Sequence, residues 1–190
     1  MINRTLFING KIKFTALDPE KDSETLSGWT GSPSFVSHYF DGFFRPYMVS
    51  EVKKKMKEML KKASESNSRY VFAIRESGAG RLVGLVKIGY VSGSNQSTHL
   101  YLDLVDEFFA QHAESALHLA LQYIFMELSL HRVSVTIPAY NEDEIALYET
   151  AGFLRESQRR QAVYHDGKYY DELVYGLLRP EWMKLQEVAE

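Results

Sequence analysis

The stretch Ala146-Leu147-Tyr148-Glu149-Thr150-Ala151-Gly152-Phe153 decides the fold class of this 190-residue chain. Asn141 precedes it, and Glu144 follows Asn141 at the three-residue spacing of a helix capping box. Gly152 suits the position just past a helix, where the backbone is often left-handed. The stretch therefore predicts a short helix that begins after Asn141 and runs to about Thr150.

Strands are expected on both sides of this helix. Arg132 to Ile137 is rich in β-branched residues and predicts a strand before it. After it, Asp166-Gly167 marks the turn of a hairpin, and Pro180 opens a short C-terminal helix. A strand, a helix and a strand in succession require parallel or mixed pairing.

Farther upstream, apolar residues recur at helical spacing from Ala113 to Leu128, which predicts a long helix packed on a sheet. The strand Thr98 to Val105 comes before it, with leucines on one face and His99, Tyr101 and Asp103 on the other. The remaining predicted elements are a hairpin around Asn9-Gly10, a helix from Pro19 to about Trp29, an irregular aromatic segment from Phe35 to Met48, a helix capped by Ser50 and running to about Ala63, and strands at Tyr70 to Arg75 and Leu82 to Val91. We therefore expect an α/β (α+β) fold with one mixed central sheet flanked by helices, as a single domain over residues 1–190.

Composition narrows the function classes. The formal charge is −3, and the one dense lysine cluster, between Lys53 and Lys62, alternates with apolar residues at helical spacing. It is therefore expected to be the solvated face of a helix, and no nucleic-acid partner is predicted. The chain has no cysteine and six scattered histidines, so no disulfide, thiolate nucleophile or metal site is expected. No long apolar run is present, so we expect no signal peptide, no membrane span and a cytoplasmic location; the oligomeric state stays open.

Three stretches, in this order, resemble the GNAT acyl-CoA N-acyltransferases: Leu130-His131-Arg132-Val133, Asn141 with Leu147 to Phe153, and Asp166 to Asp171 running on to Glu181-Trp182. The resemblance covers Lys11 to Trp182 and is closest to the branch of ribosomal-protein N-terminal acetyltransferases and spermidine acetyltransferase. It implies a GNAT-like fold and acetyl-CoA as co-substrate. It also implies transfer of an acetyl group to a primary amine, on a protein N-terminus or on a small molecule such as a polyamine or an aminated antibiotic.

The same resemblance suggests catalytic residues. Tyr148 would protonate the leaving CoA thiolate; alternatively, its ring packs on the core with the hydroxyl at the rim. His99 and Asp103 are candidate bases for the acceptor amine, and the alternative for each is a polar side chain on a solvent-facing strand. Leu102 and Leu104 belong to the strand that the family uses to bind pantetheine.

By the same resemblance, Asn141 would orient the pantetheine or the substrate amide, and it can cap its helix as well.

The cofactor loop departs from the family. The family pattern Q/R-x-x-G-x-G/A corresponds here to 108–113, which holds neither glycine nor arginine. The candidate pyrophosphate-binding residues are Ala110, Gln111, His112 and Ala113. Because larger side chains restrict close backbone approach, the alternative function is a catalytically silent GNAT-like binding module that has lost acetyl-CoA.

Overall fold

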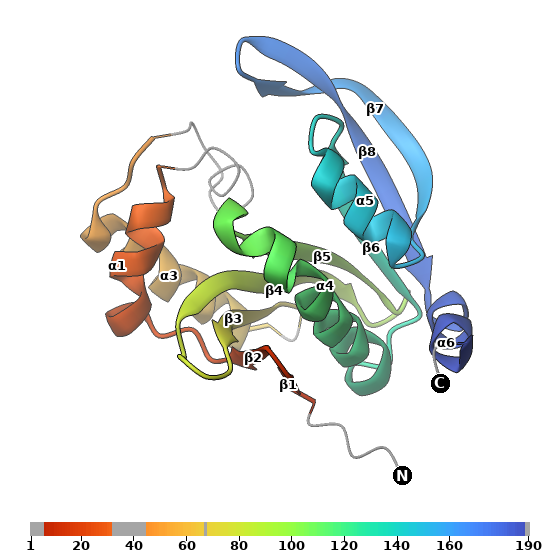
Figure 1. The fold of residues 1–190 in the computed structure, drawn as a ribbon, viewed down its shortest axis with the longest axis horizontal. Helices are drawn as coiled ribbons and strands as arrows, with labels where there is room; N and C mark the ends of the chain where they lie inside the picture. Colours follow the sequence, from red (N-terminus) through yellow and green to blue (C-terminus); the bar gives the residue numbers. More distant parts are fainter. Residues whose placement is uncertain (1–5, 32–44, 67, 189–190) are drawn as a thin grey trace. The chain divides into compact units, whose positions relative to one another are not determined.

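The computed structural model of the chain describes residues 6–31, 45–66 and 68–188. Within them the helices and strands follow one another along the chain as Figure 1 shows. They are β1 (Ile8–Asn9), β2 (Ile12–Thr15), α1 (Pro19–Trp29), α3 (Val49–Ser64), β3 (Tyr70–Glu76), β4 (Leu82–Ser92), β5 (Ser97–Leu104), α4 (Asp106–Gln122), a π-helix (Tyr123–Glu127), β6 (Arg132–Pro138), α5 (Glu142–Thr150), β7 (Leu154–His165), β8 (Lys168–Leu178) and α6 (Arg179–Val188).

The strands pair in the order β1-β2-β3-β4-β5-β6-β8-β7. β5 and β6 are parallel, whereas β1-β2, β2-β3, β3-β4, β6-β8 and β7-β8 are antiparallel. The sheet is therefore mixed, as expected. The chain divides into two compact units, Met1–Gly89 with Tyr101–Tyr123, and Tyr90–Leu100 with Ile124–Glu190. The single domain remains a prediction.

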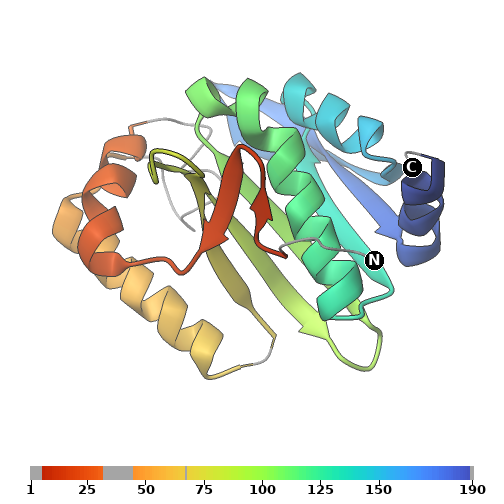
Figure 2. The same ribbon diagram turned by 60° about the horizontal axis from the view of Figure 1, so that its bottom comes forward.

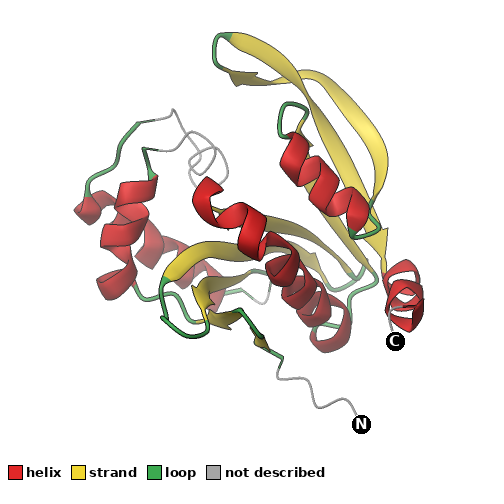
Figure 3. Ribbon diagram, viewed as in Figure 1, coloured by secondary structure: helices red, strands yellow, loops and turns green. Residues whose placement is uncertain are grey.

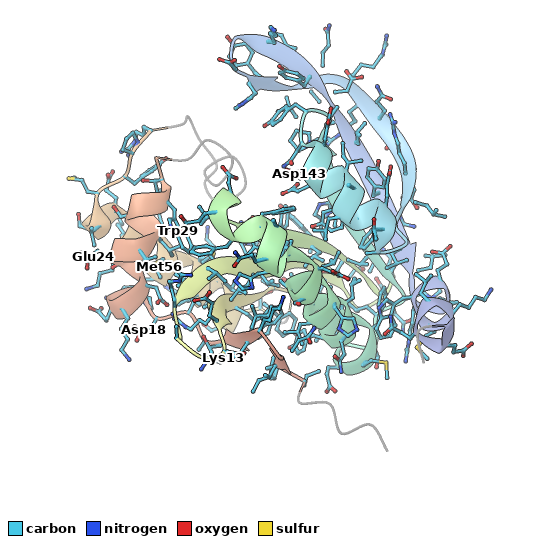
Figure 4. The ribbon with its side chains drawn as sticks, viewed as in Figure 1. Lys13, Asp18, Glu24, Trp29, Met56 and Asp143 are labelled. Carbon is cyan, nitrogen blue, oxygen red and sulfur yellow. The ribbon has the colours of Figure 1, made fainter. Side chains whose placement is uncertain are left out.

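In the first unit, α1 and α3 lie side by side (Figures 1 and 2). Their apolar faces share a core with β3 and β4, in which Met56 is fully buried and Trp29 is packed at the margin (Figure 4). Asp18 caps α1 by accepting a hydrogen bond from the Glu20 backbone N–H at 2.9 Å. The helix predicted from Pro19 to about Trp29 is therefore confirmed, with Asp18 as its N-cap.

Two predicted helix starts are wrong. α3 begins at Val49 rather than after Ser50, because the Glu51 carboxylate accepts a hydrogen bond from the Met48 backbone N–H at 3.0 Å and closes the first turn from inside the helix. α4 begins at Asp106 rather than Ala113, so that it follows β5 after one residue. Of the predicted irregular segment from Phe35 to Met48, residues 35–44 lie outside the described residues.

In the second unit, β6 and β8 bury one face and leave the other half-exposed. The buried face carries Val133, Val135, Ile137, Leu173, Tyr175 and Leu177. Helix α5 packs on this face, because the Tyr175 hydroxyl donates to Glu149 Oε1 at 2.8 Å. Figure 3 shows α5 running along the β7–β8 hairpin. Gly152 follows α5 with φ +91°, as predicted for a residue just past a helix.

Candidate active site

The candidate base His99 lies on β5 at the end of its pairing with β6. The parallel register joins Ser97 to Arg132, Thr98 to Val133 and His99 to Ser134, and no further pair follows. His99 Nε2 lies 3.2 Å from the Thr136 hydroxyl. Burial, and to a smaller degree the positive charge of Arg159, lowers the pKa of His99 below its ordinary value. A lowered pKa keeps the imidazole neutral near pH 7, which is the state a general base requires.

The other candidate base, Asp103, is on the same strand but belongs to the first unit and has an ionic partner. Asp103 is buried, with 2% of its surface exposed. Lys87 Nζ on β4 lies 2.8 Å from Asp103 Oδ2. Although this contact has ion-pair distance, the two carboxylate oxygens make no well-aligned hydrogen bond among the described residues. The solvent-facing alternative for Asp103 is therefore wrong, and the Lys87 ammonium competes with an acceptor amine for this carboxylate.

Leu102 and Leu104 alternate with Asp103 and are buried, at 4% and 6% exposure. Close packing with β4 requires Gly84, because a Cβ on that residue would lie 2.5 Å from the Asp103 carbonyl oxygen. The strand that the resemblance assigns to pantetheine is thus well ordered by its neighbour β4. The contribution of the two leucines to cofactor binding stays a prediction.

The segment that corresponds to the family's pyrophosphate loop is helical here. Val105 is the N-cap of α4, and its carbonyl accepts from Phe108 N at 2.8 Å and from Phe109 N at 3.1 Å. From Ala110 onward the amides lie inside the helix, where they bond to the carbonyl four residues back. The amides nearest the free end belong to Asp106 and Glu107, two acidic residues that oppose an anion.

Side chains of the first unit also contact residues 108–113 at the start of α4. His112 is buried at 5% exposure, with Nε2 3.5 Å from Glu76 Oε1. Arg81 pairs with Glu76 through two 3.0 Å contacts and lies 4.4 Å from the centre of the Phe108 ring. Ala113 is buried as well, whereas Ala110 and Gln111 are exposed. The pyrophosphate role of 110–113 stays a prediction, and it would require these contacts to rearrange.

The candidate acid Tyr148 lies on α5. It is 3% exposed, and its ring meets Phe153 edge-on at 5.1 Å. Because α5 covers the buried face of β6 and β8, Tyr148 and His99 lie on opposite sides of this part of the sheet. The ring therefore packs in the core as the alternative predicts, while the role of the hydroxyl stays a prediction.

Asn141 is the N-cap of α5. Its Oδ1 accepts from Glu144 N at 3.4 Å, and its own backbone N–H donates to the Pro138 carbonyl at 3.0 Å. Only the first half of the predicted capping box is therefore present. Acidic residues fill the first turn of α5, among them Asp143 (Figure 4), as the helix dipole favours.

The sequence did not predict three neighbours of the candidate bases: Lys87 beside Asp103 in the first unit, and Thr136 and Arg159, which affect His99 in the second unit. Each lies on a strand adjacent to, or beyond, that of the residue it affects, and no local motif marks it. Lys87 lies on β4, the strand next to the one that carries Asp103. Among the described residues, no group of three or more His, Asp or Glu side chains could hold a metal ion. In the part of the chain that the structure describes, no helix is long and apolar enough to span a membrane.

The order of the strands and helices, with a parallel pair next to antiparallel pairs in one mixed sheet, is that of an acyltransferase-type α/β fold. The profile of the acetyltransferase (GNAT) domain family matches residues 11–154. The chain belongs to this family, whose members use acetyl-CoA.

Individual relatives agree with this assignment. The prophage-derived N-acetyltransferase YokL of Bacillus subtilis is 25% identical over 128 residues, which cover 67% of this chain and 71% of YokL. A candidate ribosomal N-acetyltransferase of the same organism, YdaF, is 30% identical over 54% of this chain and 57% of its own. The crystal structure of Vibrio cholerae spermidine N-acetyltransferase with CoA and spermine matches with a TM-score of 0.77 at 21% identity, covering 92% of this chain and 99% of the other. The predicted GNAT-like fold is confirmed, as is the likeness to the ribosomal and spermidine branch.

Proposed function

We propose that the protein transfers the acetyl group of acetyl-CoA to a primary amine. The observation that carries this proposal is His99, a half-buried imidazole with a lowered pKa at the end of the β5–β6 pairing. After the His99–Ser134 pair, no further β5 residue is paired with β6. The backbone of β5 can therefore form hydrogen bonds with pantetheine there. Family membership supports the use of acetyl-CoA.

The proposed roles assign two proton transfers to two residues on opposite sides of the second unit's sheet, so the reacting groups would have to meet where the β5–β6 pairing ends, after His99 and Ser134. Acetyl-CoA supplies the acetyl group as a thioester. His99 accepts a proton from the acceptor ammonium so that the amine nitrogen can attack the carbonyl carbon. The new C–N bond forms, the C–S bond breaks, and Tyr148 donates its phenolic proton to the thiolate. Asn141 orients the amide groups near the start of α5. The acceptor is a protein N-terminus or a small amine, as relatives named for ribosomal and spermidine acetylation suggest.

A second function, a silent binding module, is favoured by one observation. Where the family keeps a glycine-rich loop, α4 is helical from Asp106 onward, and its first turn carries the acidic residues Asp106 and Glu107. The residues of β5 are therefore better suited to bind the pantetheine of acetyl-CoA than the start of α4 is to bind its pyrophosphate.

Calorimetry with acetyl-CoA tests the proposal against this alternative. We expect a heat of binding with a weaker affinity than is usual for the family, because α4 must accommodate the pyrophosphate without glycines. No heat, together with no thermal shift at millimolar acetyl-CoA, would support the silent module. Desulfo-CoA and adenosine 3′,5′-bisphosphate serve as controls that separate pantetheine from nucleotide contributions.

A further inference from the structure

The turn between β3 and β4 brings a guanidinium to the start of α4. Arg81 directly precedes β4, and its carbonyl accepts a hydrogen bond of 3.0 Å from the backbone N–H of Glu76, the last residue of β3. The Arg81 guanidinium lies 4.4 Å from the centre of the buried Phe108 ring, in the first turn of α4. Residues 108–113 themselves contain no arginine or lysine. Arg81 is therefore a cation from another element, placed against the segment that corresponds to the pyrophosphate loop.

A carboxylate is bound to Arg81 in the structure. Arg81 Nε and Nη2 each donate to one oxygen of Glu76 at 3.0 Å. Two phosphate oxygens can accept from the same nitrogens, because a guanidinium binds carboxylates and phosphates in the same forked geometry. The Arg81 side chain is 56% exposed, against 21% for Glu76, so a ligand can reach the guanidinium from solvent. Glu76 thus lies where an anionic ligand of Arg81 would lie.

His112 adds a second group whose hydrogen-bonding capacity is unused. It lies one helical turn after Phe108, and only 6% of its side chain is exposed. Its Nε2 is 3.5 Å from Glu76 Oε1, and neither ring nitrogen makes a well-aligned hydrogen bond to the described residues. Burying an imidazole without a hydrogen bond is unfavourable. An oxygen of a bound anion would therefore satisfy His112 better than Glu76 does at this distance.

The charges around Arg81 keep it paired with Glu76 when no ligand is bound. The pKa of Arg81 is raised by Glu76 and, to a smaller degree, by Glu107 in the first turn of α4. Arg81 in turn lowers the pKa of Glu76, with a smaller contribution from His112. Both partners are therefore ionised near pH 7. A phosphate must displace a carboxylate from Arg81 in order to bind there.

We propose that Arg81 binds the pyrophosphate of acetyl-CoA in place of an arginine from residues 108–113, and that Glu76 is an internal competitor that must release it. The inference rests on the proposed function. Phosphate oxygens replace the Glu76 carboxylate on Nε and Nη2 of Arg81, and His112 donates a hydrogen bond to the same group. Separating the Arg81–Glu76 pair costs free energy, so this competition lowers the affinity for acetyl-CoA in addition to the missing glycines.

Two substitutions in this ion pair should change the affinity for acetyl-CoA in opposite directions. Glu76→Gln removes the competing charge and should lower Kd about tenfold, whereas Arg81→Gln removes the phosphate ligand and should raise Kd about tenfold. A purely structural ion pair predicts a different result, because either substitution would then weaken the same contact and affect binding in the same direction. Isothermal titration calorimetry with acetyl-CoA measures both values. Changes of the same sign, or no change in either variant, would overturn the inference.

A matched ion pair elsewhere in the first unit serves as the control. Arg45 Nη1 and Nη2 donate to the two carboxylate oxygens of Glu51 in the same forked manner, at the start of α3. Glu51→Gln removes a carboxylate of the same kind, and the affinity for acetyl-CoA should stay unchanged. Inorganic pyrophosphate is the second probe: it should compete with acetyl-CoA more strongly in Glu76→Gln and less strongly in Arg81→Gln. Equal competition in both variants would contradict the assignment of Arg81 to the phosphates.

These binding measurements separate the inference from the proposed function. Opposite changes in Kd without any acetylated amine would support the role of Arg81, although acetyl transfer fails. Acetyl transfer by a protein whose Kd is the same in wild type and in both variants would retain the function and overturn the inference. No heat of binding with wild type or with Glu76→Gln would overturn both.

Discussion

His99 Nε2 and Thr136 Oγ1 lie 3.2 Å apart on the neighbouring parallel strands β5 and β6. Thr136 is two residues beyond Ser134, which is the last β6 residue paired with β5. The hydroxyl can donate to a neutral imidazole or accept from it, so it fixes the orientation of the ring. The contact therefore holds His99 where β5 leaves its partner strand.

The pH dependence of acetyl transfer should reflect His99. Its pKa is lowered by burial and by Arg159, so the imidazole stays neutral, and competent as a base, to a lower pH than an ordinary histidine. The acid limb of kcat/KM should have a midpoint below about 6.5, the ordinary value for histidine. Arg159→Gln should move that midpoint to higher pH, and His99→Gln should remove the limb. An acid limb that persists unchanged in His99→Gln would assign the base elsewhere.

Tyr148→Phe should lower turnover by on the order of 10²–10⁴-fold, since only the transferable proton is lost. The ring contact with Phe153 at 5.1 Å survives in phenylalanine, so the affinity for acetyl-CoA and the melting temperature should change little. Tyr175→Phe is the matched control: it removes the hydrogen bond to Glu149, which should reduce stability by about 1 kcal/mol and leave turnover intact. Steady-state kinetics in which Tyr148→Phe matches wild type, with chemistry rate-limiting, would remove Tyr148 from the mechanism.

The Lys87–Asp103 pair separates a structural from a catalytic role for Asp103. Lys87→Met leaves a carboxylate buried without its cation, because only 1% of the Asp103 side chain is exposed. It should lower the free energy of unfolding by about 3–5 kcal/mol. Replacing both partners, with Lys87→Met and Asp103→Leu, should recover much of this loss in urea denaturation. Full turnover in the folded double variant would exclude Asp103 as the base, whereas an inactive but stable double variant would support it.

Gly152 and Gly167 differ in what an added methyl group would meet. Both have positive φ, +91° and +76°, but a Cβ at Gly152 would lie 2.4 Å from Leu185 Cδ1, and at Gly167 it meets nothing within 4 Å. Gly167→Ala should therefore cost about 1–2 kcal/mol from backbone strain alone. Gly152→Ala should cost about 1 kcal/mol more, because Leu185 must give up its packing on the end of α5. Equal losses in the two variants, measured by thermal unfolding, would show that the Leu185 contact is unimportant.

The turns and caps could be predicted because each depends on residues adjacent in sequence. Gly152 has the left-handed backbone that its position after a helix requires, and Asp166-Gly167 has positive φ at both residues, as the hairpin turn demands. Asp18 and Asn141 cap their helices in the same local way. These signals needed no information about the rest of the chain.

The start of α4 was missed for a different reason. Phe108 and His112, four residues apart, are both buried. They extend the buried face of the helix from Ala113 toward its N-terminus. Periodicity alone predicts a helix that begins before Ala113, whereas the family pattern predicts a loop at these residues. The environments of His99 and Asp103 depend on strand register and on partners such as Lys87 and Arg159. Hydrophobic alternation identifies a strand's faces but does not identify its neighbours.

The most decisive measurement of acetyl transfer is to incubate the purified protein with acetyl-CoA and an equimolar mixture of peptide, amino-acid and polyamine acceptors, and to identify the products by mass spectrometry. We expect one added acetyl group on a primary amine, with free CoA released in equal amount and with both lost in His99→Gln. Binding of acetyl-CoA without any acetylated amine, or no binding at all, would contradict the proposed acetyl transfer.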